Sequence, residues 1–407
     1  MTVLTDIGQL AMCPAGGRDA GLVDDAALVW EDGRIVWAGP EADLGGQFAG
    51  ARRESAGGRL VVPGLVDCHT HLAFAGDRSD EFVERLRGTP YLEIAARGGG
   101  ILSTVRATRA ASDAELAEGA RQRAHAMLRE GVTTVEAKTG YGLTLADELR
   151  VLRVYRQLAE DIPQRIVPTL LAAHVVPPEF ADDRDAYVRL IADEMIPAVA
   201  AGGLAAFLDV FVEEGAFTTD EARAICTAGA RHGLRAKLHA DQLSDGGGAA
   251  LAAEVNAASV DHLECISASG IAALAEAGTV AVSLPIATLV LGQEPLPARR
   301  LLDAGVRVAV ATDLNPGSAP SNSLGLALWL ACTRQRMTPA EALRGATADA
   351  ARALCLSDGT GSLAPGAPAD VALVDAPSLD VWLATWRAEP VARTVVAGET
   401  VWEAADG

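Results

Sequence analysis

The sequence predicts an α/β protein: a TIM (β/α)8 barrel with a small β-sandwich-like domain formed from both ends of the chain. Three observations support this fold. Apolar strand-like runs alternate with helical patterns through the middle of the chain, both ends carry short β segments, and polar residues recur where the predicted strands end. A doubly wound open sheet is the structural alternative, but it does not explain those polar residues.

The small domain is predicted from segments at the two ends. Near the N-terminus, ALVWEDGRIVWAG alternates apolar and polar residues and turns at Asp32 and Gly33, a hairpin pattern. Near the C-terminus, GSLAPGAPADVALVDAP and PVARTVVAGETVWEA are again short β segments. We expect residues 1–60 and 357–407 to form one composite β-domain, and residues 61–356 to form the catalytic barrel, since 407 residues suit one large domain and a smaller one.

The predicted barrel strands are eight apolar runs. They lie at residues 60–71, 133–140, 165–174, 205–214, 234–241, 259–264, 279–285 and 307–313. Several of the helices between them have clear end signals. In TTDEARAICTAGARHG, Thr218 and Glu221 have capping-box spacing and Gly233 supplies the stop.

Composition limits the function classes. A formal net charge of -20 argues against nucleic acid and anionic membranes as partners, because both would repel the protein. The N-terminus shows neither a signal peptide nor a membrane anchor, so we expect a cytoplasmic protein. Six cysteines without a CxxC pair predict buried free thiols.

Six of the eight predicted strands end in a chemically useful residue. These residues are His69 and His71, His174, Glu213, His239 and Asp241, His262, and Asp313. In a TIM barrel the active site forms at the C-terminal ends of the strands. The two remaining histidines, His125 and His232, lie in helical patterns and are assigned to structure or solvent.

The motif VDCHTH predicts part of a metal site. Side chains two residues apart on a strand share one face, so Asp67, His69 and His71 should point the same way. Adding His239 and Asp313 gives three nitrogens and one carboxylate, with a position open for water. A divalent ion there lowers the pKa of water, and Asp313 could accept its proton and hand it to a leaving nitrogen.

PGLVDCHTH, KLHAD, VDHLE and ATDLNPGS together resemble the amidohydrolase superfamily, over essentially the whole chain. Further segments, including GDRSDEF, EAKTGYGL, HADQLSDGGG and DLNPGS, are similar to the imidazolonepropionase family within it. That resemblance implies hydrolysis of the cyclic amide of 4-imidazolone-5-propanoate to N-formimidoyl-L-glutamate in histidine degradation.

The resemblance also implies roles for individual residues. The metal ligands would be His69, His71, His239 and Asp313, holding one ion per chain, either Zn2+ or iron as Fe2+ or Fe3+. The substrate contacts would be Arg78, Tyr91, Tyr141, His174, Gln242, Asn315, Gly317 and Ser318. Arg78 suits a propionate carboxylate, with a surface ion pair to Asp77 or Asp80 as the alternative. The turn at residues 315–318 would offer backbone N–H groups and an amide.

The predicted catalytic residues are Asp313, His262 and Gln242. His262 would hold or polarise the ring carbonyl, with a second metal-ligand role left open. Gln242 stands three residues after His239, where related deaminases place a glutamate, and an amide cannot titrate. Only Glu213 is placed to support a second metal, so we expect one. The two lysines of the chain, Lys138 and Lys237, would be supporting or structural groups.

Two other functions remain open. One is an amidohydrolase that deaminates a heterocycle, which Gln242 argues against. The other is a non-catalytic barrel, which the complete ligand set argues against. The expected partner is a small anionic substrate, with no nucleic acid or membrane and a possible homodimer.

Overall fold

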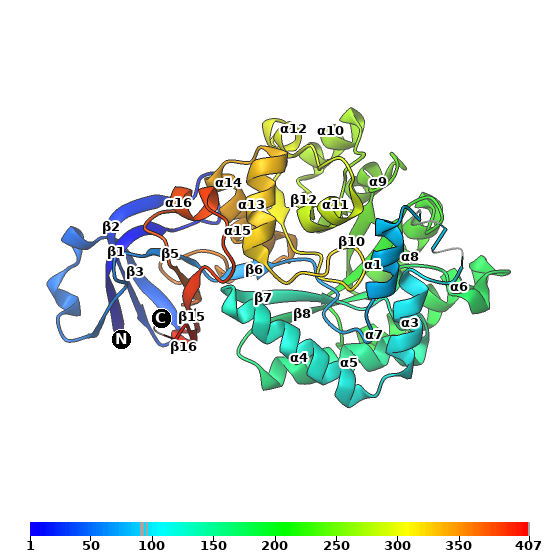
Figure 1. The fold of residues 1–407 in the computed structure, drawn as a ribbon, viewed down its shortest axis with the longest axis horizontal. Helices are drawn as coiled ribbons and strands as arrows, with labels where there is room; N and C mark the ends of the chain where they lie inside the picture. The colour runs from blue at the N-terminus through cyan, green and yellow to red at the C-terminus, as the bar shows by residue number, and fades with distance from the viewer. Residues whose placement is uncertain (90–92, 95–96, 406–407) are drawn as a thin grey trace.

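The computed structural model describes residues 1–89, 93–94 and 97–405, arranged as two β-sheets with helices around one of them (Figure 1). Tyr91, one of the predicted substrate contacts, lies outside the described residues. None of the helices in the described ranges is both long and apolar enough to cross a membrane.

The barrel sheet contains eight parallel strands that pair in chain order. They are β6 (Leu65–Asp67), β7 (Val132–Lys138), β8 (Arg165–Ala173), β9 (Phe207–Val212), β10 (Arg235–Ala240), β11 (Ser259–His262), β12 (Val280–Ser283) and β13 (Val308–Val310). The first and last strands meet through an isolated bridge between Thr70 and Leu314, and the His71 N–H donates to the Leu314 carbonyl at 2.9 Å. This arrangement confirms the predicted parallel barrel.

Residues 60–71 do not form one strand, and the prediction of a single run there is wrong. Leu60–Pro63 is β5 of the other sheet, and β6 begins only at Leu65. Gly64 separates them at a point of close approach. A Cβ on Gly64 would lie 2.3 Å from Thr133 Oγ1 and 2.9 Å from Asp370 Cβ. The chain therefore crosses from one sheet to the other at this glycine, because only a residue without a side chain fits.

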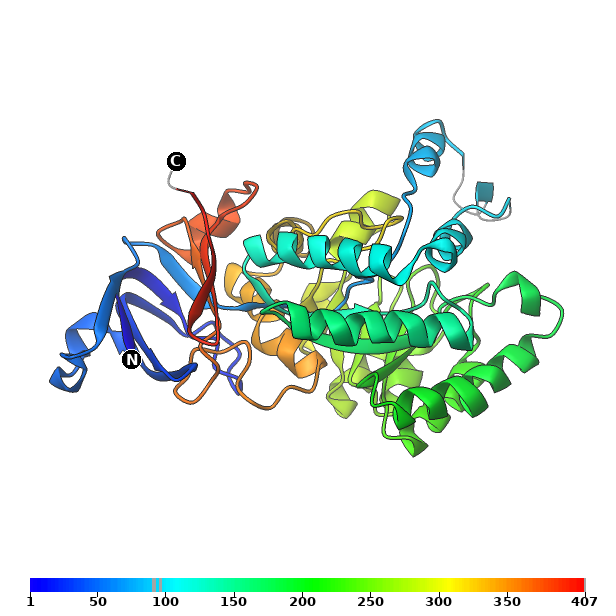
Figure 2. The same ribbon diagram turned by 90° about the horizontal axis from the view of Figure 1, so that it is seen from below.

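Helices follow most barrel strands and surround the sheet (Figures 1 and 2). They are α1 (Ser79–Leu86), α3 (Ile101–Ala110), α4 (Asp113–Arg129), α5 (Leu145–Asp161), α6 (Arg184–Leu190), α7 (Ile196–Ala201), α8 (Thr219–Arg231), α9 (Gly248–Glu254), α10 (Ala268–Ala277), α11 (Pro285–Leu291), α12 (Ala298–Asp303), α13 (Leu324–Gln335), α14 (Pro339–Gly345), α15 (Ala348–Ala353) and α16 (Leu379–Ala384). Helix α8 has the predicted capping box between Thr218 and Glu221.

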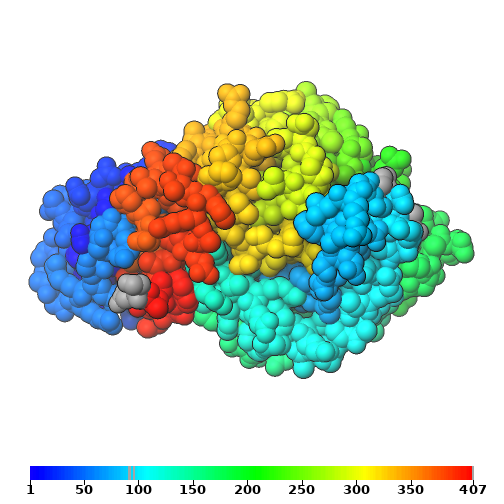
Figure 3. Space-filling view, viewed as in Figure 1, coloured from blue at the N-terminus to red at the C-terminus, as the bar shows by residue number. Residues whose placement is uncertain are grey.

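The second sheet joins the two ends of the chain. Its strands are β1 (Thr2–Ala11), β2 (Leu22–Glu31), β3 (Arg34–Pro40), β4 (Arg52–Ser55), β5, β14 (Val371–Val374), β15 (Val391–Val396) and β16 (Glu399–Glu403). Antiparallel pairing of β5 with β14 connects the N-terminal strands to the C-terminal ones. The blue and red parts of the chain consequently lie side by side in Figures 1 and 3. The terminal sheet predicted from the sequence is confirmed.

The six cysteines are all free, as predicted, but not all are buried. Cys13, Cys68 and Cys226 are buried, whereas Cys265 and Cys355 are exposed. Cys332 is intermediate. The exposed pair lies outside regular elements, in the loop after β11 and just beyond α15, where loops run over the surface. The prediction of burial is therefore wrong for these positions.

Candidate metal and substrate site

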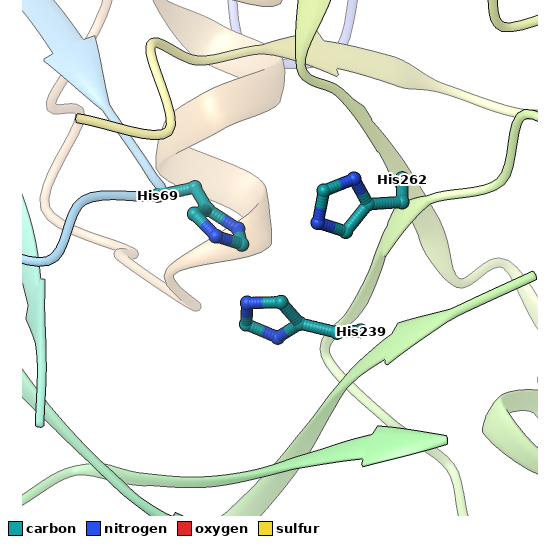
Figure 4. A group of neighbouring side chains, drawn as sticks. All are labelled: His69, His239 and His262. Carbon is teal, nitrogen blue, oxygen red and sulfur yellow. The ribbon is translucent and has the colours of Figure 1, made fainter. Parts of the chain in front are cut away.

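The four predicted metal ligands converge at the C-terminal end of the barrel. His69 and His71 follow β6, His239 lies on β10, and Asp313 follows β13. Asp313 Oδ1 lies 3.4 Å from His69 Nε2 and 3.5 Å from His71 Nε2. The rings of His69 and His239 are 4.4 Å apart between centroids, and Figure 4 shows these two rings with that of His262.

The donor atoms fit a cation. Two donors each about 2.1 Å from a tetrahedral zinc ion lie roughly 3.4 Å apart, which matches the spacing around Asp313. Among the described residues, Nε2 of His69 and Nε2 of His239 are buried without a hydrogen-bond partner. Buried polar atoms rarely stay unpaired, so these nitrogens indicate a ligand. The donors form two groups that could each hold an ion: His69, His71 and Asp313, and His69, His239 and His262.

Burial keeps two of the imidazoles neutral. It lowers the pKa of His71 to about 4 and that of His262 to about 3. His69 differs, because Asp261 and Asp313 outweigh burial and the nearby Lys138 and raise its pKa to about 9. The carboxyl of Asp313 is buried, yet His69 and His71 hold its pKa well below its usual range. Asp313 is therefore a charged carboxylate facing three imidazoles.

Two residues of the site adopt a left-handed backbone. His262 has φ 80° and Asp313 has φ 56°. Such a conformation costs a non-glycine residue on the order of 1–3 kcal/mol and is typical of functional sites, where the fold holds it in place. Around Asp313 the fold does so through its N–H, which donates to the His69 carbonyl at 3.0 Å.

Two buried carboxylates behind the site face the Nδ1 atoms of the metal-site histidines. Asp261 Oδ2 lies 2.6 Å from His69 Nδ1, and Asp209 Oδ2 lies 3.0 Å from His239 Nδ1. A carboxylate at Nδ1 accepts a hydrogen bond from the ring N–H there, which leaves Nε2 without a proton and able to bind a metal. Neither aspartate was predicted from the sequence as a supporting residue. The feature that could have indicated them is a single charged residue within an apolar strand, in FLDVFV and SVDH.

These aspartates belong to a larger layer of buried charges inside the barrel. Glu136 and Lys138 come from β7, and Lys237 comes from β10. Lys138 Nζ lies 2.6 Å from Asp209 Oδ2, 3.0 Å from Glu136 Oε1 and 3.4 Å from Asp261 Oδ2. The side chains of all five residues have 0% exposure. The predicted supporting role of the lysines thus has a defined geometry, with each ammonium paired to carboxylates.

Asp67 belongs to the VDCHTH motif and ends β6, but it is not one of the candidate metal ligands. Its carboxylate accepts hydrogen bonds from Thr312 Oγ1 at 2.6 Å and from the Thr312 N–H at 3.2 Å. Burial raises its pKa to about 6. Asp67 therefore ties the end of β6 to the segment before Asp313.

Two predicted substrate contacts lie against the metal ligands. His174 directly follows β8, and its ring stacks on His71 with centroids 5.2 Å apart and planes 14° apart. Tyr141 is buried, with its ring 5.6 Å from that of His71 and 5.7 Å from that of His174. Burial lowers the pKa of His174 well below its usual value. The two side chains form an aromatic wall beside the site.

Arg78 lies at the start of α1, against the turn that contains Gly317. Its Nε donates to Glu81 Oε2 at 2.8 Å, so the ion pair is with Glu81 and not with Asp77 or Asp80. A Cβ on Gly317 would lie 2.0 Å from Arg78 Nη1, which shows how closely the guanidinium meets the turn. The other oxygen of Glu81 accepts the Gly100 N–H at 2.8 Å.

The turn after Asp313 is held by Asn315. Its Oδ1 accepts the N–H groups of Gly317 and Ser318, both at 2.8 Å, and its Nδ2 donates to the Asp313 carbonyl at 2.7 Å. The sequence predicted that these N–H groups and this amide would face the substrate. In the structure they bond to one another, because an asparagine side chain readily closes its own turn. The turn therefore holds the backbone carbonyl of Asp313 and lies close to the Arg78 guanidinium.

Three other polar residues near strand ends are accounted for. Glu213 accepts the Leu243 N–H at 2.8 Å and the Ser244 hydroxyl, and it belongs to no metal-binding group within the described ranges. Asp241 accepts the N–H groups of Gly248 and Ala249 at the start of α9. Gln242 is buried. His125 and His232 are exposed on helical segments, as predicted.

A cavity of about 620 Å³ opens beside Arg78, within the range of roughly 300–1,000 Å³ typical of small-ligand sites. Its lining includes Phe74, Phe82, Asn315 and Gly317. It adjoins the turn after Asp313 but none of the site histidines lines it. Arg78 thus lines a cavity together with residues of the turn that follows Asp313.

Comparison with known proteins places the chain in a family. The model of the amidohydrolase family matches residues 60–401. The imidazolonepropionase of Paraburkholderia phymatum is 50% identical over 351 residues, covering 86% of each chain. The imidazolonepropionase of Geobacillus thermodenitrificans is 49% identical over 363 residues, covering 88% of this chain and 86% of the relative.

Solved structures share the fold at low identity. An adenosine deaminase from Xanthomonas campestris with bound zinc is 21% identical, with a TM-score of 0.73 over 98% of this chain and 92% of its own. A 5-methylcytosine deaminase from Klebsiella pneumoniae is 18% identical, with a TM-score of 0.73 over 100% and 98%. The chain belongs to the amidohydrolase family and, within it, to the imidazolonepropionase family.

Proposed function

We propose that the protein hydrolyses the cyclic amide of 4-imidazolone-5-propanoate to N-formimidoyl-L-glutamate, a step of histidine degradation. The observation that carries this proposal is the convergence of the side chains of His69, His71, His239 and Asp313. Imidazole nitrogens of this group are buried without a hydrogen-bond partner among the described residues. The relatives named imidazolonepropionase, at about 50% identity over most of the chain, support the choice of substrate.

The ligands proposed for the ion are His69, His71, His239 and Asp313. When bound, the ion supplies Lewis acidity: it lowers the pKa of a water and polarises a carbonyl oxygen. One divalent metal per chain is proposed, zinc or iron, since imidazole and carboxylate donors suit both. Glu213 is committed to the loop at residues 243–244, which supports a single ion over two.

Asp313 is proposed to move the proton. His69 and His71 keep its carboxylate charged, and it lies among the candidate metal ligands, so it would be able to accept a proton from a water bound there. The same carboxyl then donates to the ring nitrogen as the C–N bond breaks. Gln242 takes no part in this transfer, because its amide can only hydrogen-bond. His262, neutral through burial, is proposed to donate a hydrogen bond to the ring carbonyl.

Substrate orientation is proposed to depend on the residues around Arg78. The guanidinium can form a bidentate pair with the propionate, which a protein of net charge -20 would otherwise repel. Tyr141 and His174 would contact the ring, because they flank His71. The remaining proposed substrate contacts are Tyr91, Gln242, Asn315, Gly317 and Ser318. Because Asn315 Oδ1 accepts the N–H groups of Gly317 and Ser318, contacts at this turn are proposed to use its other atoms.

We also propose that the protein works in the cytoplasm and as a possible homodimer. Residues 1–60 with 357–407 and residues 61–356 are proposed as its two domains. The negative charge supports a partner set limited to the small anionic substrate, without nucleic acid or membrane.

The proposed function is tested by identifying the reaction product. Purified protein is incubated with 4-imidazolone-5-propanoate, ring loss is followed by ultraviolet absorbance, and the product is identified by mass. Formation of N-formimidoylglutamate without ammonia supports the proposal. Release of ammonia from heterocyclic amines, with the imidazolone left intact, would establish the deaminase alternative.

A further inference from the structure

We propose that Lys138 is a positioning residue of the metal site: its buried ammonium holds Asp209 and Asp261 against the Nδ1 atoms of His239 and His69. The inference rests on the proposed metal site. It assigns to Lys138 a specific task that burial or charge balance alone would not require.

The first step is the position of the ammonium between the two aspartates. Lys138 Nζ lies 2.6 Å from Asp209 Oδ2 and 3.4 Å from Asp261 Oδ2. The same two oxygens approach the histidines, at 3.0 Å from His239 Nδ1 and 2.6 Å from His69 Nδ1. Each of the two carboxylate oxygens is therefore close to both the Lys138 ammonium and an imidazole ring.

Asp209 depends more directly on Lys138 than Asp261 does. Asp261 has another support, since Ser259 Oγ donates to its Oδ1 at 2.7 Å. Asp209 Oδ1 has no hydrogen-bond partner among the described residues, so the carboxylate is oriented through Oδ2. Lys138 is its hydrogen-bond donor at that oxygen. Loss of the ammonium should affect His239 more than His69.

The positive charge of Lys138 lies between two negative ones. Asp209, His239 and Asp261 place their donor atoms close enough to bind a cation themselves. Lys138 supplies a permanent one, because the surrounding carboxylates outweigh burial and raise its pKa well above the usual value. Without it, two buried carboxylates would lose the cation that they share, and like charges at low dielectric repel strongly. They would turn away from the imidazoles.

Lys237 provides a matched control. It is also fully buried, and its ammonium pairs with Glu136 Oε2 and donates to the Cys68 carbonyl at 3.0 Å. Among the described residues, Lys237 forms no ion pair or hydrogen bond with Asp209 or Asp261, although its charge also lowers the pKa of Asp261. Replacing either lysine buries one unpaired charge in the same layer, but only Lys138 touches the carboxylates behind the histidines.

The experiment compares zinc binding by Lys138→Met, Lys138→Gln and Lys237→Met with the wild type. Zinc affinity is measured by competition with a chromogenic chelator, after circular dichroism shows that each metal-free variant is folded. In zinc-loaded, 15N-histidine-labelled protein, the Nδ1–H signals of His69 and His239 report whether the carboxylates still hold those protons.

We expect Lys138→Met to weaken zinc binding about 10–100-fold, the range for losing a group behind a metal ligand, and to expose the His239 Nδ1–H to solvent exchange. Lys237→Met should change affinity less than threefold. If the Met variant does not fold, Lys138→Gln decides, with at least a fivefold loss expected. Unchanged affinity in a folded Lys138 variant, an equal loss in Lys237→Met, or uptake of a second zinc ion at full affinity would overturn the inference.

The outcome is separable from the fate of the proposed function. Zinc affinity and the Nδ1–H signals need no substrate. A wild type that binds zinc but leaves the imidazolone intact would refute the proposed reaction and leave the role of Lys138 to be decided by the variants. A wild type that binds no zinc or iron would refute both.

Discussion

Asp261 Oδ2 lies 2.6 Å from Nδ1 of His69, and the opposite nitrogen of that ring lies 3.4 Å from Asp313 Oδ1. One imidazole thus joins the charge layer inside the barrel to the candidate metal ligand on the far side. Burial of Asp261 is complete, and Lys237, Lys138 and His69 outweigh it to hold the pKa of its carboxyl well below the usual range. His69 is therefore oriented by a permanently charged group.

Replacing that group should weaken the site without unfolding it. We expect Asp261→Asn to lower metal affinity about 10–100-fold, because the amide no longer draws the ring proton to Nδ1. The measurement is chelator competition on folded protein. Ser259→Ala is the matched control: it removes the hydrogen bond to Oδ1 and leaves Oδ2 in place, so its effect should be smaller. Equal losses in the two variants would argue against this role for Asp261.

The combined contribution of His69, His71 and His262 to the stability of the metal-free protein should pass through a maximum near pH 6.5. His71 and His262 have folded pKa values of about 4 and about 3, below the ordinary 6.5, so the unfolded chain binds more protons and stability falls as pH drops from 6.5 toward 4. His69 has a folded pKa of about 9, so its contribution is complete below pH 6.5 and is lost as pH rises to 9. Urea unfolding across this range tests the shape, and a curve rising steadily from pH 6.5 to 9 would contradict it.

Metal binding at pH 7 should release a proton. In the metal-free protein His69 holds an extra proton because its pKa is about 9, and a ligand nitrogen must be bare. Calorimetric titration with zinc in buffers of different ionisation enthalpy measures the number released. We expect close to one proton from His69 at pH 7 and fewer above pH 9. Binding without proton release at pH 7 would show that His69 is not a ligand.

Arg78 and Asp313 should separate binding from turnover. We expect Arg78→Met to raise KM about tenfold or more, since hydrogen bonds to charged groups are worth about 1.5–3 kcal/mol. Asp313→Asn should lower kcat about 100-fold or more. Arg85→Met is the control for Arg78, because Arg85 also reaches Gly317, through its carbonyl at 3.3 Å, and has no proposed substrate role. Similar effects of the two arginine variants on KM would exclude a carboxylate contact at Arg78.

Glu213→Gln should leave the metal content at one ion per chain. The carboxylate is engaged with the N–H of Leu243 and the hydroxyl of Ser244, which an amide oxygen can still accept in part. Elemental analysis of the purified variant checks this. A fall from two ions to one would reveal a second metal supported by Glu213.

The barrel and the convergence of the histidines could be predicted because both depend on local patterns. Strand periodicity and the position of a residue at a strand end are readable along the chain, and they placed His69, His71, His239 and Asp313 correctly at one end of the sheet. The break at Gly64 could not be read, because it arises from Thr133 and Asp370, which are distant in sequence.

The supporting groups were the harder part. Asp209 and Asp261 looked like isolated charges in apolar strands, and their purpose appears only when β7, β9 and β11 bring them around Lys138. The hydrogen bonds within the turn at residues 315–318 could not be predicted for a related reason. Its composition shows the available donors, but only the folded backbone shows that Asn315 already accepts them.

The central claim is that one metal ion, held at His69, His71, His239 and Asp313, is required for opening of the imidazolone ring. The most direct measurement is a titration of the metal-stripped protein with zinc or iron(II), recording ring loss and bound metal on the same samples. The account predicts no activity without metal and a linear rise to a plateau at one ion per chain. Full activity in the stripped protein, or a metal-replete protein that leaves the ring intact, would contradict it.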